Sequence, residues 1–281
     1  MDYRELPPPP EVAEHVRCLW TLRGDGSTNR EHVVCDAAAG TTDAEAEAAL
    51  PDGSPELIFN FGAPFEYLSP DGGRIRQPQA FLVGQITRPF AVVATGAVEL
   101  LAVRFDAHGA ALACDDVGAL LNTWLSIESL PACGVVELAV ALRERADPGA
   151  RIDLVSDWLR GLVRERHAAH PQVVAAVHAI RRSHGAANVD ALCESLAVSP
   201  RTLQRLFARQ VGITPKLLAR IVRFQCVLRA WRSDQGTFAR VAVESGYFDQ
   251  SHLVRDFRDF AGAPPAGFLA ALPVFTAQFL S

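Results

Sequence analysis

The sequence has no apolar run long enough to cross a membrane. Nowhere in its 281 residues is there a stretch near the ~20 uninterrupted apolar residues that a spanning helix needs. Its first residues also lack an apolar segment followed by a small-residue cleavage site. We therefore expect a cytoplasmic protein with no membrane partner. The 49% hydrophobic content is ample for the buried cores of two domains.

Clustered metal ligands are missing as well. The six cysteines are scattered, with no CxxC pair, and His15, His32 and His108 lie far apart along the chain. A metal-binding barrel would need two or three histidines and a glutamate at close spacing. The segments 52–53 and 71–73 are typical of hairpin turns and not of phosphate-binding loops. We expect no metal, no cofactor and no catalytic residues.

Charge is distributed unevenly along the chain. The overall net charge of −5 by itself argues against a nucleic-acid partner. Residues 171–281, however, carry 13 Lys and Arg against 7 Asp and Glu, a net charge of +6, whereas residues 1–170 carry −11. Only the C-terminal part is therefore suited to meeting phosphates. Pro171 marks the predicted boundary between one domain at 1–170 and another at 171–281.

The N-terminal part is predicted to form β-structure followed by helices. Apolar segments of strand length at 57–61, 80–83, 90–94 and 98–105 are separated by Gly-, Pro- and Asp-containing breaks, which favours a barrel or sandwich. Residues 37–50 fit either a short helix or a loop. From His108 to about Ala168 the spacing of Ala, Leu and Val predicts helices. The amphipathic segment 152–166 fits a dimer or interdomain helix, or equally a helix packed on its own domain.

An internal repeat at an offset of fifty residues dominates the C-terminal part. It pairs Leu203 with Leu253, Arg205 with Arg255, Phe207 with Phe257, Gly212 with Gly262, and Pro215 with Pro265. Each copy begins at a residue that can cap a helix, Ser199 or Asp249. Shorter helices are predicted upstream, at 189–196 and 238–244. Each unit is therefore predicted to be a helix, a tight turn and a second helix.

The second helix of each unit has one apolar face, and its outward face can donate to base edges and phosphates. The candidate DNA-binding residues are Arg201, Gln204, Arg205 and Arg209 in the first unit and Gln250, Ser251, His252, Arg255 and Arg258 in the second. Asp256 and Asp259 lie among them, and we expect them to pair with Arg255 or Arg258.

One continuous helix is predicted between the units, at residues 215–232. It would carry an apolar stripe on one side and a separate basic stripe of Lys216, Arg220 and Arg223. Its length of about 27 Å is comparable with the ~34 Å between successive major-groove faces of DNA. Such a connector would place both second helices on one side of a duplex.

Residues from about 188 to 268 resemble the DNA-binding domain of the AraC/XylS family of transcription regulators. The family pattern is met by Ser199, Leu203, Arg205, Phe207, Gly212 and Pro215 in the first unit, and by Ala242, Gly246, Tyr247, Asp249, Ser251, Arg255, Phe257, Gly262 and Pro265 in the second. Cys193 departs from the pattern, because the family usually has Ala there. The resemblance implies a bacterial regulator, with an activator as the expected type, that reads promoter DNA with two helix-turn-helix units. RNA polymerase and a second copy of the chain are its expected partners.

The family usually joins this module to a sensing or dimerising domain, often a cupin-like β-barrel. Segments 50–65 and 81–89 resemble an N-terminal domain of unassigned ligand found in some of these regulators. The sequence thus predicts an α+β protein of two domains. The first is a β-rich, cupin-like barrel or sandwich with trailing helices, and the second is an all-α tandem helix-turn-helix domain.

A small-molecule effector is the expected partner of the N-terminal domain. Glu56 and Glu99 are candidate anchoring carboxylates, and Cys18 with Cys35 offers an alternative redox or alkyl-accepting sensor. Two other hypotheses stay open. An enzyme fused to a DNA anchor would hold convergent polar groups or a metal in a pocket. A module for protein partners would lack a closed apolar pocket and expose an apolar patch.

Overall fold

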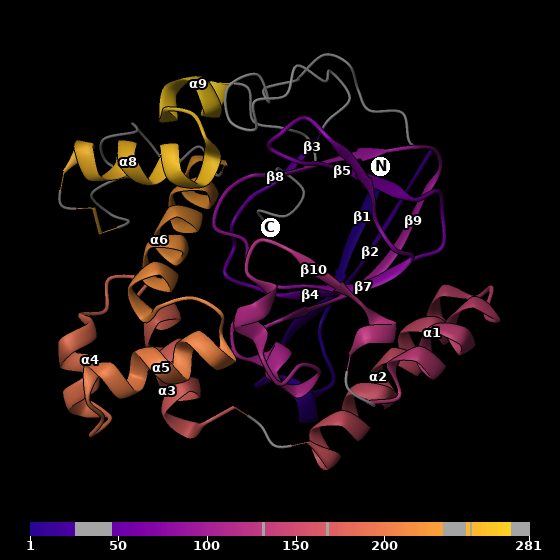
Figure 1. Cartoon of the computed structure of the whole chain (residues 1–281), viewed down its shortest axis with the longest axis horizontal. Helices are drawn as coiled ribbons and strands as arrows, with labels where there is room; N and C mark the ends of the chain where they lie inside the picture. The colour runs from indigo at the N-terminus through magenta and orange to yellow at the C-terminus, as the bar shows by residue number, and fades with distance from the viewer. Residues whose placement is uncertain (26–46, 131–132, 167–168, 233–245, 248, 271–281) are drawn as a thin grey trace.

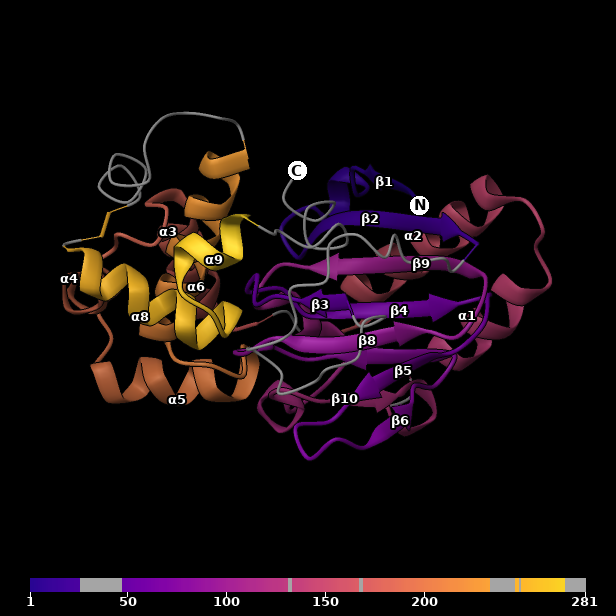
Figure 2. The same ribbon diagram turned by 90° about the horizontal axis from the view of Figure 1, so that it is seen from above.

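A β-sandwich and a group of helices lie side by side in the molecule (Figures 1 and 2). The computed structural model describes residues 1–25, 47–130, 133–166, 169–232, 246–247 and 249–270. The predicted helix at 238–244, with Ala242, lies outside the described residues, as do His32, Cys35 and most of segment 37–50.

Two antiparallel sheets form the sandwich. The six-stranded sheet has the order β1-β2-β9-β4-β7-β10, with β1 at Asp2–Leu6, β2 at Val16–Gly24, β9 at Val98–Phe105, β4 at Glu56–Asn60, β7 at Ala80–Val83 and β10 at Trp124–Ser126. The four-stranded sheet has the order β3-β8-β5-β6, with β3 at Glu47–Ala49, β8 at Phe90–Ala94, β5 at Phe65–Leu68 and β6 at Arg74–Arg76. The predicted strands at 80–83, 90–94 and 98–105 are confirmed, and the one at 57–61 is shifted by one residue.

Both faces of the six-stranded sheet are covered. Trp20 and Leu100 pack against Phe90 of the other sheet, whereas Leu101 lies in a second cluster on the opposite face together with Leu138 of a helix. A strand that is buried on both sides needs no alternation of polar and apolar residues. This is why the sequence pattern does not predict β2, although it is the longest described strand.

The segment after the sandwich differs from its prediction. Residues 108–130 form three short 3-10 turns, η2 at Gly109–Leu112, η3 at Val117–Leu120 and η4 at Ile127–Ser129, together with strand β10. A further turn, η1, lies at Pro10–Val12. Regular helix begins only at α1, Val135–Arg143, and continues with α2, Pro148–Glu165. Apolar spacing predicted helices because a buried turn and a buried helix place apolar residues at similar steps.

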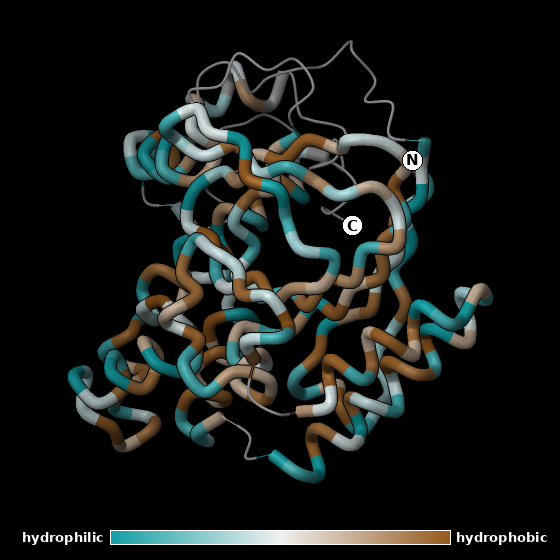
Figure 3. The backbone as a smooth tube through the Cα atoms, turned by 45° about the vertical axis from the view of Figure 1, so that its right-hand side comes forward, coloured by the Kyte–Doolittle hydropathy of each residue, from teal (hydrophilic) through white to brown (hydrophobic). Residues whose placement is uncertain are grey.

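Helix α2 packs on its own domain. Its apolar side chains Val155 and Leu159 are fully buried in the same cluster as Leu138 of α1 and Leu101 of β9. Hydrophobic and hydrophilic residues alternate along both helices, as the coloured tube makes visible (Figure 3). The Asp147 side chain caps α2 by accepting a hydrogen bond from the backbone N–H of Ala150. Of the two roles predicted for segment 152–166, packing on its own domain is the one observed.

The C-terminal part is all helix and turn in the described residues. It contains α3 at Pro171–Arg182, α4 at Val189–Ser195, α5 at Pro200–Gln210, α6 at Pro215–Arg232, α8 at Gln250–Ala261 and α9 at Pro265–Ala270. Their buried side chains form one core, which also includes Leu50 and Ala107 from the sandwich. The predicted class, a β-rich domain with trailing helices followed by a helical domain, is confirmed.

Candidate DNA interface and ligand cavity

The first helix-turn-helix unit is formed by α4 and α5. The Asn188 side chain caps α4, and the Ser199 hydroxyl caps α5 by accepting a hydrogen bond from the backbone N–H of Thr202 at 3.2 Å. Leu203 and Phe207 are completely buried on the inner face of α5. The predicted DNA-binding residues on its outer face are all exposed, namely Arg201, Gln204, Arg205 and Arg209.

The second unit presents α8 in the same manner. The Asp249 carboxylate accepts a hydrogen bond from the backbone N–H of His252 at 2.7 Å and so caps the helix. Leu253 and Phe257 are completely buried. Four of the predicted DNA-binding residues are exposed, namely Gln250, Ser251, Arg255 and Arg258. His252 is half-buried, because its ring packs edge-on against Tyr247.

Helix α6 links the two units, with α5 near one end and α8 near the other (Figure 1). Its bounds are those predicted from the sequence. It is more deeply buried than a single apolar stripe implies, because Leu218 and Val227, which lie off that stripe, are also fully buried. The helix contacts α3, α5 and α8. It is therefore the core of the helical domain as well as a connector.

Two of the three residues in the predicted basic stripe on α6, Arg220 and Arg223, bind groups within the helical domain, whereas Lys216 is exposed. Arg220 donates to the buried Asp256 carboxylate through Nε at 2.9 Å and Nη2 at 2.7 Å, and also to Asp259. The Tyr247 hydroxyl donates to the other oxygen of Asp256 at 3.1 Å. The expectation that Asp256 and Asp259 pair with Arg255 or Arg258 is therefore wrong. Because Arg220 satisfies both carboxylates, Arg255 and Arg258 are left exposed on the outer face.

The sandwich touches the first unit directly. Turn η3 packs against α5, and the space between them is so narrow that a Cβ on Gly118 would lie 2.4 Å from the carbonyl oxygen of Ala208. A second contact joins α6 to the sandwich, where the Gln225 amide donates to the carbonyl oxygen of Pro51 at 2.7 Å. The N-terminal domain therefore contacts both the first helix-turn-helix unit and the helix that links the two units.

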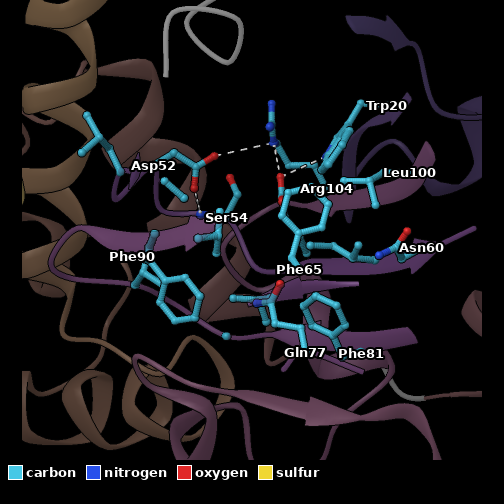
Figure 4. A pocket seen from close by; sticks show the side chains of 18 of the residues that line it. Trp20, Asp52, Ser54, Asn60, Phe65, Gln77, Phe81, Phe90, Leu100 and Arg104 are labelled. Carbon is cyan, nitrogen blue, oxygen red and sulfur yellow. Dashed lines mark hydrogen bonds and ion pairs between the residues drawn. The ribbon is translucent and has the colours of Figure 1, made fainter. Parts of the chain in front are cut away.

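A cavity opens inside the sandwich (Figure 4). It encloses about 1030 Å³ of space, including its open mouth. Most of its wall is apolar, and four aromatic side chains from four different strands contribute to it, namely Trp20, Phe65, Phe81 and Phe90. Gln225 of α6 also lines the cavity. The cavity thus extends from the core of the sandwich to the helical domain.

One end of the cavity is charged. Arg104 of β9 donates through Nε to Glu56 at 2.7 Å, and the same Nε lies 3.6 Å from Asp52. The Trp20 indole N–H donates to the same Glu56 oxygen at 3.1 Å. Burial, opposed by the Arg104 guanidinium, raises the pKa of the Glu56 carboxyl above its usual range. An aromatic cavity with a few convergent polar groups is the usual form of a small-molecule site.

Of the two predicted anchoring carboxylates, only Glu56 lines this cavity. Glu99 binds Arg23 at 2.6 Å and Arg151 at 2.9 Å in a separate hollow. Cys18 is buried, and burial raises the pKa of its thiol to about 11, which keeps it protonated and poorly reactive. Nothing in its surroundings supports the alternative of a redox or alkyl-accepting sensor at this residue.

Two histidines that are distant in the sequence meet in the fold. His15 Nδ1 and His108 Nε2 lie 3.3 Å apart, and the His108 ring packs edge-on against His178 of α3. Sequence separation alone suggested that His15 and His108 were unrelated. No group of three possible metal ligands occurs among the described residues. Nor is any described helix both long and apolar enough to cross a bilayer.

Comparison with known protein families agrees with this arrangement. A family described as a helix-turn-helix domain matches residues 192–271, and a family described as a domain of unknown function matches residues 4–122. The match at residues 192–271 agrees with the AraC-type helix-turn-helix domain that the sequence predicts, and it supports a DNA-binding transcription regulator. No curated protein matches the sequence.

Solved structures to which the chain is similar share little of its sequence. A single-residue variant of ToxT from Vibrio cholerae, in its apo form, is 10% identical with a TM-score of 0.48, covering 90% of this chain and 97% of that one. Wild-type ToxT from the same organism, bound to an unsaturated fatty acid, is 10% identical with a TM-score of 0.47 over 81% and 91% of the chains. The AraC-like activator CuxR is 13% identical with a TM-score of 0.25 over 80% and 78%. At such TM-scores no functional conclusion follows.

A strained turn in the first unit was not predicted. Ala197, between α4 and α5, has a φ of +48°, whereas the corresponding turn of the second unit has Gly246 at +77°. A left-handed backbone is unfavourable for alanine because of its Cβ. We expect Ala197→Gly to raise the free energy of unfolding by about 0.5–1 kcal/mol. Ala191→Gly, at an exposed helical position of α4, should lower it by up to about 1 kcal/mol. Urea unfolding of both variants would test this, and a loss of stability in Ala197→Gly would contradict it.

Most of the cavity's polar residues were not predicted from the sequence. Asp52 was assigned to a hairpin turn, but residues 50–55 instead connect the two sheets, from β3 to β4. Arg104 left a usable signal, because it directly follows the apolar run 100–103 within a strand, and a buried charge needs a partner. Gln225 left no such signal, because one glutamine on a long helix is ordinary.

Proposed function

We propose that this chain regulates transcription by placing α5 and α8 in successive major grooves of promoter DNA, under the control of a small molecule bound in the sandwich. The observation that carries the proposal is the pair of capped helices at the two ends of α6. Each helix buries its Leu and Phe and leaves its Arg and Gln side chains exposed. A buried α6 would fix the spacing between the two helices, as recognition of two grooves requires.

Control by a ligand is supported by the loop at residues 50–54. Asp52 and Ser54 line the cavity, while Gly53, between them, accepts a hydrogen bond from Arg181 of α3 at 2.9 Å through its carbonyl oxygen. Pro51 in turn accepts the hydrogen bond from Gln225 of α6. A molecule that displaces this loop would act on two helices of the DNA-binding domain. Ligand binding would then change the population of DNA-competent arrangements.

The competing hypotheses fit less well. A module for protein partners was expected to lack a closed apolar pocket, whereas this sandwich contains an aromatic cavity. An enzyme is compatible with polar groups in a pocket, but Arg104, Glu56 and Asp52 are paired with one another in an arrangement suited to binding. An enzyme would convert its ligand, so recovery of a bound ligand unchanged would separate the two hypotheses.

Loss of an arginine from the outer face of either helix should weaken specific DNA binding. We expect Arg205→Ala and Arg255→Ala each to cost about 1–3 kcal/mol, as for an arginine that reads a guanine. The measurement is fluorescence anisotropy of the full-length protein on a labelled fragment from upstream of its own gene, compared with random duplex across a salt series. Genome-wide selection of bound fragments would supply the site if that fragment lacks it.

Arg145→Ala provides the matched control. Arg145 is exposed on the N-terminal domain and its replacement removes the same charge. The control should bind DNA as the parent protein does. Equal affinity and sequence preference in Arg205→Ala and the parent would reduce Arg205 to a surface charge. Failure of the parent protein to select any DNA would overturn the proposal.

Other expectations stay predictions. These are the division at residues 170 and 171, homodimer formation, contact with RNA polymerase and activation of transcription. The first is supported by the end of α2 at Glu165 and the start of α3 at Pro171. Sedimentation of the full-length protein with and without DNA would test the second.

A further inference from the structure

The cavity combines aromatic walls with a charged end. Trp20, Phe65, Phe81 and Phe90 line it together with aliphatic side chains, and Asp52 and Arg104 lie at the charged end (Figure 4). The face of an aromatic ring carries negative charge density and attracts cations. The walls therefore favour an apolar body and tolerate a positive charge.

The lining of the cavity carries more negative than positive charge. Its charged side chains are two carboxylates, Asp52 and Glu56, and one guanidinium, Arg104. Just outside it, Glu5 accepts a hydrogen bond from Arg104 at 2.9 Å, and Arg17 and Arg229 line the same outer hollow. Within the cavity itself, carboxylates therefore outnumber guanidinium groups by one.

The hydrogen bonds of Glu56 are unevenly shared between its two oxygens. Both Arg104 and Trp20 donate to Oε1. No described residue donates to Oε2. The Glu56 side chain is 19% exposed, so Oε2 can accept a hydrogen bond from a ligand in the cavity. Burial raises the pKa of this carboxyl, which is the expected consequence of an incompletely compensated charge.

A second, independent polar group lies in the cavity away from the charged end. Gln77 is only 8% exposed, and its side chain has no hydrogen-bond partner among the described residues. It lies beside Phe81 in the close view (Figure 4). Buried amides are almost always hydrogen-bonded, so this side chain is available to a polar atom of a ligand.

We propose that the cavity binds an organic cation with an apolar, ring-containing body and a protonated amine. The ammonium group donates to Glu56 and Asp52, the body packs among the aromatic side chains, and Gln77 meets a polar atom of the body if one is present. This assignment rests on the proposed function of the cavity as an effector site. A carboxylate ligand is disfavoured, because inside the cavity it would compete with Asp52 and Glu56 for Arg104.

Three compounds with the same body separate the possibilities. Isothermal titration of the full-length protein with phenylbutylamine, phenylbutanol and phenylbutyrate compares a cation, a neutral molecule and an anion. We expect the amine to bind about tenfold more tightly than the alcohol, as for one added charge-assisted hydrogen bond. The acid should bind more weakly than the alcohol. Tighter binding of the acid than of the amine, or no binding of any of the three, would overturn the proposal.

Two isosteric variants test the named carboxylates. Glu56→Gln and Asp52→Asn should each weaken binding of the amine about tenfold and weaken binding of the alcohol much less. Two positions are used because replacement of Glu56 also changes a buried partner of Arg104. Glu99→Gln is the control, because Glu99 lies in an adjacent strand but outside the cavity. Unchanged amine binding in both test variants would also overturn the assignment.

DNA binding of the same samples distinguishes failure of the proposed ligand class from failure of the proposed function. If the amine fails to bind but DNA is bound with the expected dependence on Arg205, the ligand class is wrong and the proposed DNA-binding function is retained. If the amine binds with the expected charge preference but leaves DNA affinity unchanged, the ligand class stands and control by ligand fails.

Discussion

Asp256→Ala should lower the free energy of unfolding of the helical domain by about 3 kcal/mol. Asp256 is completely buried between α8 and α6 and accepts hydrogen bonds from Arg220 and Tyr247. Its removal leaves the Arg220 guanidinium and the Tyr247 hydroxyl without their buried acceptor and opens a cavity. Urea unfolding of the full-length protein, followed by circular dichroism, would measure the loss.

Asp259→Ala is the matched control for this prediction. Asp259 binds the same arginine, but its side chain is 47% exposed. An exposed ion pair contributes at most about 1 kcal/mol. Equal losses in the two variants would mean that burial of Asp256 is unimportant. Because Asp256 fixes α8 against α6, we also expect Asp256→Ala to weaken DNA binding at temperatures where the protein remains folded.

Acidification should destabilise the contact between the sandwich and α3 through His108. Burial, opposed by the nearby Asp106 carboxylate, lowers the pKa of His108 to about 4. The usual value in an unfolded chain is about 6.5. Between these values the unfolded chain binds a proton that the folded protein does not bind. The stabilisation is therefore complete above the unfolded value and is lost as the pH falls toward the folded one.

The expected loss through His108 is about 2 kcal/mol between about pH 7 and about pH 5. Burial also lowers the pKa of His15, the hydrogen-bonding neighbour of His108. Protonation of His15 on acidification should therefore also destabilise the folded protein. The measurement is urea unfolding of the parent protein and of His108→Gln at both pH values. The variant has no titrating group at this position, so its free energy of unfolding should fall less between the two pH values than that of the parent protein. Parallel losses in the two proteins would contradict the role of His108.

The helix-turn-helix units were predictable because their signals are local. Caps at Ser199 and Asp249 satisfy N–H groups within the same helical turn. The i, i+4 spacing of Leu203 and Phe207 defines a buried face without reference to the rest of the chain. The bounds of α6 followed from the same spacing. The exposed arginines on the outer faces could be named before the fold was known.

The cavity and the contacts between domains were not predictable in this way. Glu56, Arg104 and Trp20 are brought together by pairing of strands that are distant along the chain. His15 and His108 are separated by 93 positions and are joined by the same pairing. Arg220 illustrates most clearly the limit of prediction from sequence, because a basic stripe on a helix has the same sequence pattern whether it faces DNA or a buried carboxylate.

The sequence by itself determined the order of the β-rich and helical parts, the capped helices α5 and α8 and the residues exposed on their outer faces, because hydrogen bonding and apolar spacing within one helix set these features. Tertiary structure alone decided which charges are buried, which carboxylate lines the cavity and which loop joins the cavity to the helical domain. The physical reason is that the free energy of a charge depends on its solvent exposure and on its neighbours in space. Both are fixed only when distant segments pack together.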